Sequence, residues 1–167
     1  MNNTIYKRNL KEILHDILEN KMEPYWFITY HYKENKTNEE EVLMDVRDIK
    51  NKLKRVIYQN RDKTITGMGE YYYPRIVFIN EKSRCGTDQY HTHMVIEKLP
   101  TTINTQAAVE RIIKQILPQK SRSVSKWKRI DVQRVSTERS DIHRLSRYLT
   151  KQNTLDFLSL DPFNSDL

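Results

Sequence analysis

Tyr90-His91-Thr92-His93-Met94-Val95-Ile96 is the stretch of the sequence that decides the fold. Aromatic, β-branched and other apolar residues surround its two histidines, a composition typical of a strand. Successive side chains of a strand point to opposite faces of a sheet, so His91 and His93 share one face while Thr92 and Met94 share the other. Two neutral imidazoles on one face are half of a divalent-metal site. The stretch therefore predicts a strand that carries metal ligands.

Further helices and strands are expected on both sides of this strand. Helical spacing of apolar residues predicts helices over 4–21, 38–57, 104–117 and 140–152. Aromatic and β-branched runs predict strands over 25–32, 65–73, 75–80 and 127–135. Between the expected strand 75–80 and the histidine strand we expect a polar loop over 81–89. This order, with its short aromatic strands, favours an α+β fold in which helices flank an antiparallel sheet.

The size and composition of the chain indicate one soluble domain. With 167 residues we expect a single domain over 1–152, in which a first helix (1–21) precedes a core that carries the motifs (24–152). The remaining residues, 153–167, form an acidic tail that we expect to pack loosely. Cys85 is the only cysteine, so an intramolecular disulfide is excluded. No apolar run approaches the ~20 residues that cross a bilayer, and we expect no membrane partner.

Positive charge is concentrated in the second half of the chain. The net charge is +7, and residues 111–151 hold 12 basic and 3 acidic side chains. Clustered positive charge is typical of a protein that binds a polyanion, so we expect contact with nucleic acid. The candidate DNA-binding residues are Lys120, Arg122, Lys126, Lys128, Arg129, Arg144 and Arg147.

The two histidines need a third ligand, and Glu70 is the favoured candidate. It follows Gly67 and Gly69, and glycines inside a strand pattern indicate a bulge or a close backbone approach that can aim a side chain. A carboxylate with two imidazoles suits Mn²⁺ or Mg²⁺. Glu81 and Glu97 are weaker candidates for the same role.

Tyr148 is the candidate nucleophile. In a helix, Lys151 and Gln152 lie three and four positions later, on roughly the same face. Lys151, Arg144 and Arg147 can supply the positive field that a tyrosine nucleophile needs and can hold a phosphate. A metal site together with an activated tyrosine suggests phosphoryl transfer through a covalent intermediate.

Three motifs in order resemble the HUH endonucleases, specifically the single-tyrosine nuclease domains of rolling-circle replication initiators (Rep proteins). The aromatic strand is Trp26-Phe-Ile-Thr-Tyr30, the His-x-His motif is His91-Thr-His93, and the Tyr-x-x-Lys motif is Tyr148-Leu-Thr-Lys151. The resemblance covers roughly residues 24–152. In Rep domains of small single-stranded DNA viruses a glutamate completes the metal site, and Glu70 occupies that place here.

The resemblance implies a five-stranded antiparallel sheet and a defined chemistry. A monomer would nick and join single-stranded DNA, at an origin or a hairpin, through a 5′-phosphotyrosine intermediate, and so start rolling-circle replication of a plasmid or virus. A helicase would act in trans or belong to a longer parent chain. The protein would work in a bacterial cytoplasm, or in a host nucleus if it is viral.

Alternatives within and outside this superfamily stay open. Single-tyrosine transposases use a glutamine four positions after the tyrosine as a metal ligand, which leaves the third ligand open between Glu70 and Gln152; Lys151, a Rep feature, favours Glu70. A transposase would need a hairpin end and usually a dimer. Relaxases often use three histidines, and the motif here has two. A non-catalytic nucleic-acid-binding domain with structural histidines is the remaining alternative.

Overall fold

The structure is a computed structural model of the chain. It describes residues 11–32, 38–60, 73–82, 90–117, 127–151, 160–161 and 164–166, with the backbone alone at 127–129 and 151. Within these ranges, no helix is both long enough and apolar enough to span a membrane.

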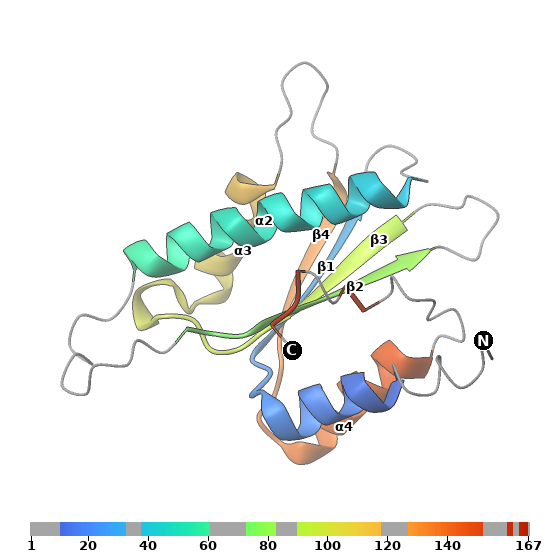
Figure 1. The fold of residues 1–167 in the computed structure, drawn as a ribbon. Coiled ribbons are helices and arrows are strands. Elements are labelled where there is room, and N and C mark those ends of the chain that lie inside the picture. The colour runs from blue at the N-terminus through green and yellow to red at the C-terminus, as the bar shows by residue number, and fades with distance from the viewer. Residues whose placement is uncertain are drawn as a thin grey trace.

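A four-stranded antiparallel sheet forms the centre of the molecule (Figure 1). Its strands, in chain order, are β1 (Trp26–Tyr32), β2 (Ile76–Lys82), β3 (Tyr90–Ile96) and β4 (Trp127–Arg134), and they lie side by side in the order β2-β3-β1-β4. The α+β class with helices around an antiparallel sheet is confirmed. The described residues contain four strands where the resemblance implies five, and all but the last residue of the expected strand 65–73 lies outside them.

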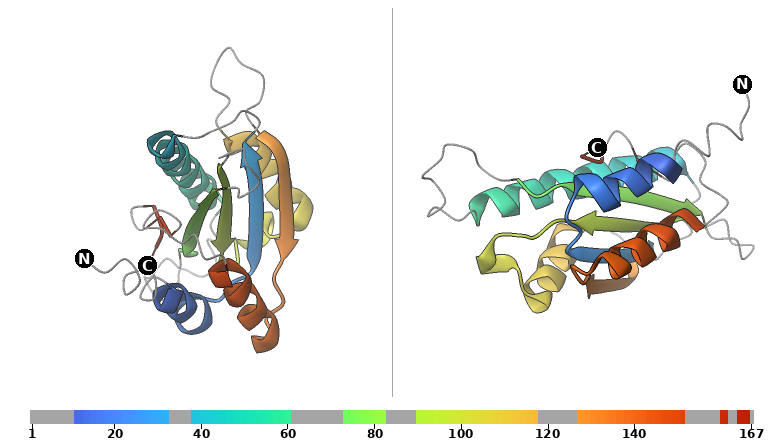
Figure 2. Two further views of the ribbon diagram at one scale, coloured as in Figure 1. Left: turned by 90° about the vertical axis from the view of Figure 1, so that its right-hand side faces the viewer. Right: turned by 90° about the horizontal axis from the view of Figure 1, so that it is seen from below.

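Helices cover both faces of the sheet (Figure 2). One face is covered by α2 (Glu39–Gln59) and α3 (Gln106–Ile116), and a short 3₁₀ turn, η3 (Thr101–Ile103), precedes α3. The other face is covered by α4 (Arg139–Lys151) and by an N-terminal helix. That N-terminal helix is α-helical over 11–16 and continues into a π-helical turn, η1 (Ile17–Lys21).

The larger core lies between the sheet and the pair α2 and α3. The side chain of Asn38 accepts a hydrogen bond from the backbone N–H of Glu40 and so caps the start of α2. Thr105 caps α3 through the N–H of Ala108. Helical spacing places the apolar residues of α2 in one buried stripe, formed by Val42, Val46, Ile49, Leu53 and Ile57. This core fixes β1 and β3, the strands that bear the aromatic and histidine motifs.

A smaller core lies on the opposite face, beneath the N-terminal helix and α4. Its buried members are Leu14, Ile17, Leu18, Met22, Val77, Ile79, Val95, Leu149 and Leu160. Burial of an aliphatic side chain of this kind contributes about 1.5–3 kcal/mol. This second core holds α4 against the same sheet face to which His91 and His93 belong.

The C-terminal segment (residues 160–161 and 164–166) lies along the outer edge of β2. Leu160 forms a β-bridge with Ile79, and the backbone N–H of Asp166 donates to the carbonyl of Ile76. Leu160, Asp161 and Asn164 are buried. The expectation of a loosely packed tail is therefore wrong for this segment, because its backbone completes hydrogen bonds that the edge strand would otherwise leave open.

Candidate metal centre and nucleophile

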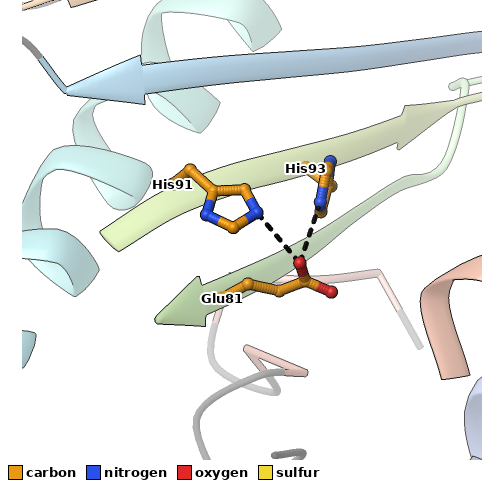
Figure 3. A group of neighbouring side chains, drawn as sticks. All are labelled: Glu81, His91 and His93. Atoms are coloured by element: carbon orange, nitrogen blue, oxygen red, sulfur yellow. Dashed lines mark hydrogen bonds and ion pairs between the residues drawn. The ribbon is translucent and has the colours of Figure 1, made fainter. Parts of the chain in front are cut away.

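Strand register brings a carboxylate next to the two histidines. In the antiparallel pair of β2 and β3, Glu81 lies opposite His91 and Ile79 lies opposite His93. Glu81, His91 and His93 therefore share one face, as Figure 3 shows. The sequence-based prediction that 81–89 is a loop is wrong at Glu81, because β2 continues to Lys82.

The three side chains converge on one point. Glu81 Oε2 lies 2.9 Å from His91 Nε2 and 3.2 Å from His93 Nε2. The candidate ligand atoms all lie within 4.8 Å of one another. Glu81 and His93 are buried, and His91 is partly buried. The geometry allows all three residues to bind one ion.

The donor set fits a divalent cation. Glu81 Oε1 is buried and has no hydrogen-bond partner among the described residues. A buried carboxylate oxygen without a partner is costly, and a cation would satisfy it. Two imidazole nitrogens and a carboxylate are ligands that divalent metals accept in proteins. The triad can hold a divalent metal, as expected from His91 and His93. The choice between Mn²⁺ and Mg²⁺ stays a prediction.

The ionisation of Glu81 prepares it as a ligand. Burial opposes the charged form, but hydrogen bonds from His91 and His93 outweigh burial and lower the pKa of Glu81 to about 2. The carboxylate is therefore ionised at neutral pH, which is the form that binds metal.

β1 supports the triad from the next strand. Thr29 Oγ1 lies 2.8 Å from His93 Nδ1. When a cation takes the place of the Nε2 proton, Nδ1–H can donate to this hydroxyl and the Nε2 lone pair of His93 is then free to bind the cation. At the adjacent pair of the same two strands, the ring of His31 stacks on the ring of His91. The ring centroids are 5.2 Å apart and the ring planes meet at 13°. Both histidine ligands thus have fixed ring orientations.

Tyr148 lies beside the triad. Its ring centroid is 5.9 Å from that of His93 and 6.1 Å from that of Phe27, both at an edge-to-face angle. The side chain is 50% exposed, so a large substrate can reach it. Burial of the remaining part raises the pKa of the Tyr148 hydroxyl, and the negative charge of Glu81 raises it further. The hydroxyl is therefore protonated at neutral pH when the centre holds no cation.

A hollow of about 510 Å³ opens next to Tyr148. Its floor is the sheet face of β1 and β4, and its wall is α4. The lining residues are Phe27, Thr29, His31, Asp131, Gln133, Arg144, Leu145 and Tyr148. Tyr148, the Glu81–His91–His93 triad and the hollow therefore adjoin one another on a single sheet face.

The other predicted site residues have different fates. Glu70, Gln152, Lys120, Arg122 and Lys126 lie outside the described residues. Lys128, Arg129 and Lys151 are described by their backbone alone, with Lys151 as the last residue of α4. Arg144 and Arg147 are exposed on α4, one turn or less from Tyr148, and Arg144 forms an ion pair with Asp141.

Glu97 has a structural role away from the triad. Its carboxylate accepts hydrogen bonds from the backbone N–H groups of Glu23, at 3.0 Å, and Arg75, at 2.8 Å. It therefore ties the chain before β1 to the chain before β2. The interpretation of Glu97 as a weak ligand candidate is wrong, because both carboxylate oxygens bind backbone at the far end of β3.

Sequence reasoning ranked Glu81 below Glu70, although a signal for Glu81 was present. Val77, Ile79 and Glu81 alternate with residues of the other face, so a strand extended by two residues places Glu81 on the histidine face. A hairpin that pairs this strand with the next then sets Glu81 opposite His91. Thr29 carried no comparable signal, because its role depends on the pairing of β1 with β3.

Comparisons of this chain with protein-family models, with curated proteins and with solved structures found no significant match.

Proposed function

We propose that this protein is a metal-dependent endonuclease that nicks and joins single-stranded DNA through a covalent bond to Tyr148. The observation that carries the proposal is the position of Tyr148, whose ring lies 5.9 Å from that of His93 beside the Glu81–His91–His93 triad. A tyrosine hydroxyl next to a divalent-metal site is the arrangement that phosphoryl transfer to tyrosine needs.

Charge around the tyrosine supports a nucleic-acid substrate. Residues 111–151 carry 12 basic and 3 acidic side chains, and Tyr148 lies within this range. Arg144 and Arg147 are exposed on the same helix. Such an excess binds a phosphate backbone with a strong dependence on salt. Exposure of half the Tyr148 side chain also suits a polymer better than a small enclosed substrate.

The reaction exchanges one phosphodiester for another. The Tyr148 oxygen attacks the phosphorus in line, the bond from phosphorus to the 3′ oxygen breaks, and the phenolic proton is passed through solvent to the leaving oxygen. A cation held by the triad supplies polarisation of the phosphate. Lys151, one helical turn after Tyr148, helps to orient the hydroxyl and offsets charge on the phosphate. A later 3′ hydroxyl reverses the step and joins strands.

The order of motifs favours an initiator of rolling-circle replication as the biological role. Lys151 three positions after Tyr148 is the feature that distinguishes this role from that of the transposases with which the chain shares Gln152.

The test is capture of the covalent product. The protein is incubated with a mixed pool of single-stranded oligonucleotides and Mn²⁺, and mass spectrometry identifies any tyrosine joined to a nucleotide. We expect an adduct on Tyr148 that Tyr148→Phe abolishes while DNA binding persists. The matched control is Tyr58→Phe, because Tyr58 is also exposed but lies on α2. This variant should still form the adduct.

Two results would contradict the proposal. One is an adduct that survives in Tyr148→Phe, because another residue would then be the nucleophile. The other is cleavage that continues after thorough chelation with EDTA, since polarisation of the phosphate by the cation would then be unnecessary.

A further inference from the structure

The hollow beside Tyr148 contains a carboxylate that the proposed reaction does not use. Asp131 of β4 lies opposite Thr29 of β1, which in turn lies opposite His93 of β3. Two strand spacings therefore separate Asp131 from His93, about 10 Å. Asp131 does not belong to the group of ligand atoms that lie within 4.8 Å of one another, but it lies within the reach of a nucleotide whose phosphate is at the triad.

A neighbouring amide fixes the orientation of this carboxylate. Gln133 Nε2 donates to Asp131 Oδ2 at 2.7 Å. No described residue donates to Asp131 Oδ1. An ionised carboxylate only accepts hydrogen bonds, so Oδ1 presents an acceptor to whatever occupies the hollow.

The charge of Asp131 decides which part of a nucleic acid fits there. A phosphate placed against the Asp131 carboxylate is repelled. A phosphate is better placed on the α4 side of the hollow, where Arg144 lines it. An exocyclic amino group of a base, in contrast, donates directly to a carboxylate. The Asp131 side of the hollow therefore suits a base rather than the backbone.

The remaining walls and the size also suit a base. Phe27, Leu145 and Tyr148 contribute apolar surface to the lining, and aromatic rings stack on bases of any sequence. The volume of about 510 Å³ lies within the range of roughly 300–1,000 Å³ typical of small-molecule pockets. One nucleotide fits such a space.

We propose that this hollow binds the base next to the cleaved phosphate and that Asp131 selects a base with an exocyclic amino group, namely adenine, cytosine or guanine, over thymine. This inference rests on the proposed function. Thymine has no amino group, and its one edge donor, N3–H, lies between two carbonyl oxygens that the carboxylate repels. Asp131 is thus a specificity-determining residue beside the reacting centre.

The test compares base preference at the positions that flank the nick. Products formed from a randomised oligonucleotide pool with Mn²⁺ are sequenced, for the wild type and for Asp131→Asn. We expect the wild type to disfavour thymine at one flanking position by at least about fivefold, near the lower end of discrimination by hydrogen bonds to base edges. An asparagine side chain both donates and accepts, so Asp131→Asn should bring thymine to within about twofold of the other bases.

A matched control and a second measurement keep the inference independent of cleavage. Asp48→Asn makes the same chemical change on α2, on the opposite face of the sheet, and should leave the preference unchanged. Binding of oligo(dC) and oligo(dT) in EDTA gives the second measurement. We expect tighter binding of oligo(dC) by the wild type and a smaller ratio for Asp131→Asn.

Each outcome decides the question. An adduct without discrimination against thymine at either flanking position overturns the inference and leaves the proposed function standing. An equal loss of rate with every base in Asp131→Asn also overturns it, because Asp131 would then act on the reaction itself. Failure of the adduct with a persistent binding preference for oligo(dC) supports the base pocket and contradicts the nuclease.

Discussion

At the scale of single residues, the candidate metal centre includes a hydroxyl that supports a histidine without belonging to the triad. Thr29 Oγ1 lies 2.8 Å from His93 Nδ1, and that contact determines which nitrogen of His93 faces the centre. Thr29 and His93 come from different strands that are paired opposite each other. The orientation of the ligand is therefore a property of the β1–β3 register.

Replacement of this hydroxyl should weaken metal binding without removing a ligand. For Thr29→Val we expect the affinity for Mn²⁺ to fall about 10- to 100-fold, because His93 loses the acceptor that holds its ring and tautomer. Isothermal titration calorimetry measures the change. Thr29→Ser keeps the hydroxyl and should bind Mn²⁺ nearly as the wild type does. An unchanged affinity in the valine variant would show that the rest of the packing orients His93.

Residue-scale prediction from sequence worked where strand parity alone was sufficient. His91 and His93 were expected on one face, and both belong to the triad. The choice of Glu70 followed from a resemblance and from its glycines, whereas Glu81 required the exact end of β2 and its pairing with β3. Which strand residues lie opposite one another is set by tertiary packing, which a local pattern does not contain.

At the scale of elements, the helix of the candidate nucleophile is held by the N-terminal helix. His15 Nδ1 lies 2.5 Å from Ser146 Oγ and 3.0 Å from Glu19 Oε1, and His15 Nε2 lies 3.2 Å from Thr150 Oγ1. His143 Nδ1 lies 3.1 Å from the same oxygen of Glu19. Polar contacts thus connect the N-terminal helix to α4 at residues before Tyr148 (His143 and Ser146) and after it (Thr150).

This contact predicts a pH dependence of stability. The hydrogen bond with His15 lowers the pKa of Glu19 below its ordinary value; partial burial opposes this effect, and His143 adds to it. The unfolded chain therefore binds more protons than the folded chain near pH 4.5, and stability rises with pH through that range. The contribution of Glu19 is present above its ordinary pKa and is lost as pH falls through the lowered value.

Urea unfolding at pH 7 and at stepwise lower pH values tests this dependence. Glu19→Gln should lower the free energy of unfolding at pH 7 by about 1 kcal/mol or less, as for other ion pairs near a surface. The difference from the wild type should shrink as pH falls below about 4.5. Glu110→Gln, on α3 and remote from this contact, is the control. A difference that stays constant with pH would contradict the assignment to Glu19.

The elements themselves were largely predictable, whereas their ends were less so. The apolar stripe of α2 and the aromatic run of β1 lie where periodicity and composition put them, since these signals are local. The end of β2 was missed because Glu81 and Lys82 are polar and resemble loop residues. They are held in the strand by pairing with His91 and Tyr90 of β3, a non-local cause.

At the scale of the whole molecule, a bound cation would join three positions on two neighbouring strands. Glu81 belongs to the edge strand β2, and the histidines belong to β3. The folded state presents the three ligand atoms within 4.8 Å of one another, an arrangement that the unfolded chain lacks. Binding of a cation to the triad would therefore be coupled to folding.

Thermal unfolding measures this coupling. At a Mn²⁺ concentration of 100 times Kd, binding adds about 2.7 kcal/mol, which raises Tm by roughly 5–10 °C for a chain of this size. EDTA should reverse the shift. Glu81→Gln should abolish most of it, and Glu70→Gln should leave it intact if Glu81 is the ligand. A shift lost only in Glu70→Gln would instead support the sequence-based choice.

The C-terminal segment covers the edge of β2 but is synthesised after it. A ribosome delivers β2 and β3 long before residues 160–161 and 164–166. Until those residues emerge, β3 is the only strand paired with β2 among the described residues. The edge that the segment later covers, at Ile76, Phe78 and Ile79, belongs to the same strand as the candidate ligand Glu81. We expect a cation at the triad to be bound firmly only after translation has passed Asp166 and its backbone N–H has reached Ile76.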